Sequence, residues 1–146
     1  MIEKQLEQDI KTAMLARDSE TTEVLRGLKS ALLYYKVANS KRDQELDNQE
    51  IISVFSKESK KRQESADLYV QGGNQDRADK ELSEKKIIDK YLPAKMSLDE
   101  LSEVVDQIVS ENQGSNMGQI IGMVRAKTQG AADGGDIAKL VKEKIG

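Results

Sequence analysis

The sequence predicts an all-α protein built from two helical parts, and three observations support this. Apolar residues recur with a period near 3.6 along most of the 146-residue chain, which is typical of amphipathic helices. No stretch alternates apolar and polar residues for long enough to indicate a sheet. The only proline, Pro93, separates two helical patterns, and proline disfavours helical geometry in the residue before it. We therefore expect an N-terminal part of about four helices, residues 1–93, joined near Pro93 to a C-terminal three-helix part, residues 94–146, with flexibility at the joint.

Two helices are expected before a polar loop at residues 38–46. The first covers residues 2–17, where apolar side chains recur at helical spacing. Asp18-Ser19 then interrupts the pattern with residue types that cap a helix N-terminus. The apolar side chains of the second helix share one stripe, which consists of Val24, Leu25, Leu28, Ala31, Leu32 and Tyr35.

Two further helices are expected between the polar loop and the joint. Asp47 opens the third with a spacing to Glu50 that resembles a capping box. Gly72-Gly73 ends this helix in the usual C-terminal manner. Asn74 caps a fourth helix, which ends at Tyr91-Leu92-Pro93.

Three helices are expected after the joint. Ser97 opens the first, with Glu100 three residues later completing a capping box. The next helix covers Met117 to Thr128 and is closed by Gly130. Its inward side chains are expected to be Met117, Ile120, Ile121 and Val124. A tight turn at Asp133-Gly134-Gly135-Asp136 caps the last helix.

The composition excludes several classes of function. The chain has no cysteine, and therefore neither a disulfide framework nor a thiolate metal site. It has no histidine, which is the commonest general base and zinc ligand. No catalytic constellation, metal site or cofactor site is visible among the remaining residue types. The start of the chain is charged and no long apolar run follows, so we expect no membrane span and a cytoplasmic location.

Charge is distributed unevenly along the chain. The net charge is −3, which does not suggest a polycation that seeks nucleic acid. Residues 114–146 nevertheless contain five basic residues against three acidic ones, a local balance of about +2. The basic residues of this segment are Arg125, Lys127, Lys139, Lys142 and Lys144. The C-terminal part is therefore a candidate for phosphate contacts.

Two further features have both a structural and a functional interpretation. Lys57, Lys60, Lys61 and Arg62 form a basic cluster on one helix, which we interpret as a solvated face in preference to a phosphate site. Gly118 and Gly122 lie four residues apart and therefore on one face of a helix, where each glycine costs about 1 kcal/mol relative to alanine. Close packing of another helix is the favoured reason for these glycines. The alternative is close approach of an RNA backbone or a partner protein.

The order and spacing of several short motifs resemble the YqeY family along essentially the whole chain. The matching residues are Leu25-Arg26, Leu28-Lys29, Lys60-Lys61-Arg62 with Ser65 and Tyr69, Tyr91-Leu92-Pro93, Met117-Gly118, Gly122, Gly130 and Ala132-Asp133-Gly134. Members of this family are similar to the C-terminal tail of the B subunit of the glutamine-dependent aspartyl/glutamyl-tRNA amidotransferase. The resemblance implies two helical parts joined near Pro93. It also implies an association with carbon–nitrogen ligase chemistry, which other domains and subunits of the amidotransferase perform.

The resemblance suggests a non-catalytic module that binds tRNA or a tRNA–enzyme complex. The residues expected to form this surface are Met117, Gly118, Gly122, Arg125, Lys127, Gly130, Lys139 and Lys142. Ala131 stands where the family pattern often has a basic residue after the glycine, which leaves Arg125 and Lys127 as substitutes. A protein-interaction module with no RNA ligand is the alternative, and the net acidity fits it. A catalytic duty within an amidotransferase is disfavoured because no nucleophile constellation is present.

Overall fold

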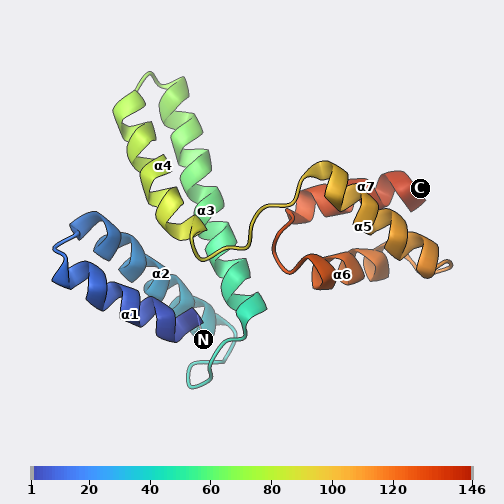
Figure 1. The fold of residues 1–146 in the computed structure, drawn as a ribbon, viewed down its shortest axis with the longest axis horizontal. Helices are drawn as coiled ribbons and strands as arrows, with labels where there is room; N and C mark the ends of the chain where they lie inside the picture. The colour runs from blue at the N-terminus through green and yellow to red at the C-terminus, as the bar shows by residue number, and fades with distance from the viewer. Residues whose placement is uncertain (1, 146) are drawn as a thin grey trace. The chain divides into compact units, whose positions relative to one another are not determined.

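The computed structural model describes residues 2–145, and every regular element in that range is an α-helix (Figure 1). The seven helices are α1 (Ile2–Leu15), α2 (Ser19–Ala38), α3 (Asn48–Gln71), α4 (Gln75–Asp89), α5 (Leu98–Glu111), α6 (Met117–Thr128) and α7 (Gly134–Ile145). This confirms the predicted all-α fold with four helices before Pro93 and three after it. The chain forms two compact units, which we call the N-terminal unit (Met1–Leu92) and the C-terminal unit (Pro93–Gly146). The flexibility expected at the joint stays a prediction.

The N-terminal unit is organised around α2, which contacts each of the other three helices of the unit. Its core consists of Leu6, Val24, Leu25, Leu28, Leu32, Leu46, Ile51, Val54, Phe55 and Ile88. Phe55 is completely buried, and its ring meets the ring of Tyr91 edge-on with a centroid distance of 5.6 Å. The Tyr91 hydroxyl donates a hydrogen bond to Asp9 of α1. This single side chain therefore ties the segment before the joint to both the core and the first helix.

The α3–α4 hairpin is held by polar contacts as well as by apolar ones. Arg62 turns inward and lies 3.0 Å from a carboxylate oxygen of Glu84 and 3.5 Å from one of Glu81. One turn earlier on α3, the Ser59 hydroxyl donates to Asp89, the last residue of α4, across 2.5 Å. Arg62 therefore does not belong to an exposed basic cluster, because its charge is used between the two helices.

Helix caps follow the predicted residues with one difference. The Asp47 carboxylate accepts the Glu50 amide at 2.8 Å, and the Glu50 carboxylate accepts the Asp47 amide at 3.4 Å, which completes the expected capping box. At the start of α5, the Ser97 hydroxyl accepts the Glu100 amide at 3.1 Å. The reciprocal bond from Glu100 does not form among the described residues, so this cap is half of the predicted box.

The C-terminal unit buries one apolar cluster between its three helices. The cluster consists of Leu101, Val105, Ile108, Ile120, Val124, Ile137 and Val141. The Met96 amide donates to the carbonyl of Ala131 at 2.8 Å, which joins the segment before α5 to the α6–α7 turn. Because the cluster lies between α5, α6 and α7, the faces of α6 and α7 that do not contribute to it remain exposed. Among the helices described, none is long and apolar enough to cross a membrane.

Candidate nucleic-acid interface

The outward face of α6 carries the two glycines singled out by the sequence. Gly118 and Gly122 are exposed, and a Cβ atom placed on Gly122 would meet nothing within 4 Å. A Cβ atom on Gly118 would meet only the side chain of Asn116, the cap of the same helix, at 3.5 Å. Within the C-terminal unit, the expectation that another helix packs on these glycines is therefore wrong. The cluster between α5, α6 and α7 is formed by the opposite side of α6, which leaves the glycine face open.

Three side chains anchor the inward side of α6. Ile120, Val124 and Thr128 are buried, and they recur every four residues. The Thr128 hydroxyl donates to the carbonyl of Val124 at 2.9 Å, so its burial leaves no polar atom unsatisfied. Met117 was expected to point inward, but 42% of it is exposed. It stands in the first turn of the helix and is not a member of the buried cluster.

The end of α6 turns sharply and leaves backbone near the surface. Gln129 has φ 47° and Gly130 has φ 87°, so two successive residues adopt the left-handed conformation. Glycine adopts this conformation without a steric penalty, which explains why Gly130 ends the helix. The Gln129 amide donates to the carbonyl of Arg125 at 3.0 Å. Both residues of this turn are exposed, and Lys127 precedes them in the last helical turn.

Arg125 connects this turn to the start of α7. A Cβ atom on Gly134 would lie 2.8 Å from a terminal nitrogen of the Arg125 guanidinium and 3.7 Å from its central carbon. The guanidinium therefore lies against the first residue of α7, where glycine leaves room for it. Beside it, the Asp133 carboxylate accepts the Gly135 amide at 2.7 Å and caps the helix. Each of these residues could be singled out from the sequence, but this contact could not, because no local spacing joins residues 125 and 134.

The lysines of α6 and α7 remain exposed. Within residues 2–145, no acidic side chain lies within ion-pair distance of Arg125, Lys127, Lys139 or Lys142. Lys139 and Lys142 are three residues apart on α7 and therefore lie on one face. Lys144 differs, because it forms an ion pair with Asp106 of α5. Within the described residues, no hydrogen bond or ion pair joins the lysines of α7 to Lys127. Among the predicted residues, Arg125 of α6 is the one whose side chain lies against the start of α7.

Charge is segregated among the helices of the C-terminal unit. Helix α5 has five acidic residues and no basic one, whereas α6 has two basic residues and no acidic one. The acidic residues of α5 are Asp99, Glu100, Glu103, Asp106 and Glu111. An anionic ligand would therefore be repelled by α5 and attracted by α6 and the outer face of α7.

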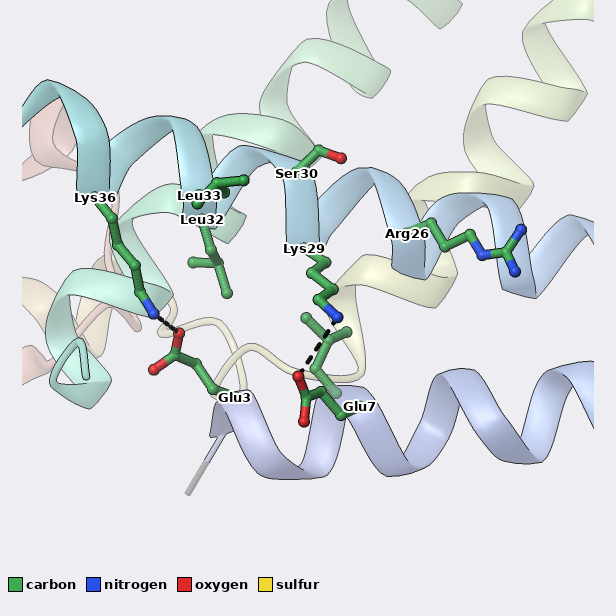
Figure 2. A pocket seen from close by; sticks show the side chains of 9 residues that line it. Glu3, Glu7, Arg26, Lys29, Ser30, Leu32, Leu33 and Lys36 are labelled. Atoms are coloured by element: carbon green, nitrogen blue, oxygen red, sulfur yellow. Dashed lines mark ion pairs between the residues drawn. The ribbon is translucent and has the colours of Figure 1, made fainter. Parts of the chain in front are cut away.

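A groove in the N-terminal unit offers no comparable site. It has a volume of about 430 Å³ and lies between α1 and α2. Figure 2 shows that Lys36 and Lys29 reach across it to Glu3 and Glu7 of α1. Both lysines are therefore already paired with carboxylates. Among the described residues, no group of three or more acidic side chains is arranged to hold a metal ion.

Comparison with known proteins identifies the family. The family model described as Yqey-like protein matches residues 3–145. The chain belongs to the YqeY family. The match covers the N-terminal unit, the joint and the C-terminal unit together, as the order of the motifs predicted.

Two curated relatives of this YqeY protein come from yeasts, and both are named altered inheritance of mitochondria protein 41, mitochondrial. The protein from Kluyveromyces lactis is 30% identical over 130 residues, which are 84% of this chain and 69% of the relative. The protein from Eremothecium gossypii is 32% identical over 108 residues, which are 73% of this chain and 58% of the relative. More than two fifths of the second relative therefore lies outside the match.

The names of these relatives contradict the expected cytoplasmic location. Both are mitochondrial proteins by name. The expectation depended on the absence of a long apolar run, and that observation does not distinguish one aqueous compartment from another. The relation to the amidotransferase tail and the binding of tRNA are not named in either relative.

Proposed function

We propose that this YqeY protein is a non-catalytic accessory module that binds tRNA or a tRNA–enzyme complex through the outer face of α6 and the start of α7. The observation that carries the proposal is the open glycine face beside basic side chains that have no acidic partner among the described residues. The similarity of the family to a tRNA-recognising tail of an amidotransferase B subunit supports the choice of ligand.

The glycines favour a large, flat ligand over a small one. Glycine at positions 118 and 122 weakens α6, and among the described residues only the Asn116 side chain approaches the space that the two glycines leave. A ligand backbone can approach the helix closely there, because no side chain holds it away. Met117 and Met123, each next to one of these glycines in the sequence, are 42% and 38% exposed and provide adaptable apolar contacts.

The charges favour a phosphate backbone. Arg125 presents a guanidinium that lies against Gly134, and a guanidinium is suited to bidentate phosphate contacts. Lys127 stands two residues further on α6, and Lys139 and Lys142 follow on α7. Because few aromatic side chains are present, base stacking contributes little, and recognition depends on backbone and shape. Such binding weakens steeply as salt concentration rises.

The test is the affinity for bulk tRNA of the natural chain and of a variant with Arg125→Glu, Lys127→Glu and Lys142→Glu. We expect the variant to lose most of its affinity. The dependence of binding on salt should also become shallower, by roughly one logarithmic slope unit for each phosphate contact removed. An unchanged affinity would exclude this surface.

A matched control places the same charge change in the N-terminal unit. Lys57, Lys60 and Lys61 are exposed on α3, and reversing all three changes the net charge by the same amount. We expect this control to retain most of the tRNA affinity. Equal losses in the two variants would show that net charge alone governs binding. Binding of a protein partner that survives nuclease treatment, without any tRNA binding, would favour the protein-interaction alternative.

A further inference from the structure

The outer face of α2 is unusually apolar for a surface that no other helix of the N-terminal unit, as described, covers. Leu33, Tyr34 and Val37 are 55%, 80% and 59% exposed, and they lie together in the C-terminal half of the helix. The inward stripe of α2 already fills the core of the N-terminal unit. A helix that is apolar on both sides is typically buried on both sides. The second side therefore indicates an interaction surface.

The exposed residues of this face follow a heptad spacing. Glu23, Gly27, Ser30, Tyr34 and Val37 are separated by four, three, four and three residues, and all five are exposed. This is the spacing at which one helix packs along another over several turns. A Cβ atom on Gly27 would meet nothing within 4 Å, so the middle of the face is open. Figure 2 shows Ser30 projecting away from the ion pairs that Lys29 and Lys36 make with α1.

Beside the N-terminal half of this face, between the start of α2 and the end of α1, lies a shallow hollow. The hollow has a volume of about 410 Å³. Its walls are formed by Met14, Arg17, Ser19, Thr22, Glu23 and Arg26. A terminal nitrogen of Arg26 lies 3.5 Å from the Met14 sulfur, so a methionine and a guanidinium stand side by side in it. Both groups form favourable contacts with aromatic rings.

The protruding side chains and the hollow are complementary in chemistry. Tyr34 carries an aromatic ring for Met14 and Arg26, and its hydroxyl is a donor for the Glu23 carboxylate. The two features stand about twelve residues apart along α2, or roughly 18 Å at the helical rise. The midpoint falls at Gly27 and Ser30, where side chains are smallest. Two α2 helices in antiparallel orientation would thus place each protrusion over the hollow of the other copy.

We propose that this protein forms a two-fold symmetric dimer in which the outer faces of two antiparallel α2 helices pack together. One surface supplies both complementary features, which is the condition for an isologous interface. Gly27 of one copy lies opposite Ser30 of the other, and this lets the two backbones approach closely. Tyr34 of each copy enters the hollow of the second copy. The occupant of the face is a second copy because an unrelated partner would not account for the presence of both features on one helix.

The first test is sedimentation of the full chain over a wide range of concentrations, with two exposed substitutions compared. We expect a monomer–dimer equilibrium in the natural chain. Tyr34→Glu should weaken dimerisation by about tenfold or more. The matched control Leu68→Glu changes a side chain that is 67% exposed on α3 and should leave the equilibrium unchanged. A natural chain that is monomeric at every concentration, or a dimer that tolerates Tyr34→Glu, would overturn the proposal.

The second test uses the absence of natural cysteine, which makes any introduced thiol unique. Gly27→Cys protein is mixed with Ser30→Cys protein and oxidised mildly. We expect a mixed disulfide in high yield, because these two positions face each other across the proposed two-fold axis. Ser53→Cys, an exposed position on α3, is the control for random collisions. A yield of mixed disulfide no greater than the yield from Ser53→Cys would overturn the antiparallel arrangement, even if a dimer exists.

Discussion

The clearest physical prediction concerns Gly122 of α6. Replacing it with alanine adds a Cβ atom in open space, because nothing lies within 4 Å of that position. Alanine in a helix interior is favoured over glycine by about 0.8–1.0 kcal/mol. We therefore expect Gly122→Ala to stabilise the C-terminal unit by nearly this amount, which corresponds to a rise in melting temperature of roughly 4–8 °C for a small domain. Thermal unfolding and hydrogen exchange of the α6 amides would measure the change.

Gly114 provides a matched control for this prediction. A Cβ atom on Gly114 would also meet nothing within 4 Å, but its φ is 90°, which alanine rarely adopts. Gly114→Ala should therefore destabilise the unit by about 1 kcal/mol, although the surrounding space is equally open. If Gly122→Ala also destabilised the unit, the conclusion that nothing packs on the glycine face would be refuted. If Gly122→Ala stabilised the unit and weakened tRNA binding, the result would indicate that glycine is needed there for ligand binding.

Three further outcomes follow from single contacts. Tyr91→Phe should lower the free energy of unfolding by about 1–2 kcal/mol in urea titrations, because the hydrogen bond to the half-buried Asp9 is lost. The Lys41 ammonium lies 2.7 Å from the Glu50 carboxylate and holds the pKa of Glu50 below its ordinary value of 4.5. Its stabilising effect is therefore complete above that value and lost as pH falls through the lowered pKa. In the Glu50→Gln variant, the free energy of unfolding should therefore fall less steeply as the pH is lowered below 4.5. An unchanged dependence on pH would show that the pair of Lys41 and Glu50 contributes nothing. Ser97→Ala should cost about 1 kcal/mol by removing the α5 cap, while tRNA affinity measured well below the melting temperature stays the same.

The helices could be predicted because their limits are encoded locally. Asp47, Asn74 and Asn116 each accept a backbone amide three residues later, so the cap residue and the start of the helix are neighbours in the sequence. Gly72 and Pro93 mark helix ends for equally local reasons. Periodicity then assigned the inward face of α6 correctly except at Met117, which stands in the first turn of the helix and is not a member of the buried cluster.

Features that join distant residues could not be predicted. The bond from Ser59 to Asp89 spans 30 residues and depends on how α3 and α4 are aligned. The contact of Arg125 with Gly134 depends on the path of the α6–α7 turn. The exposure of Gly122 likewise depends on which faces α5 and α7 cover. No periodic pattern carries that information, so the candidate surface needed the structure.

The most direct test of the proposed function is the binding of the purified full chain to bulk tRNA, titrated at several salt concentrations. An unstructured RNA of the same length is the reference. We expect micromolar or tighter binding that weakens as salt rises and exceeds the affinity for the reference RNA. No binding at low salt, or equal binding to both RNAs, would contradict it.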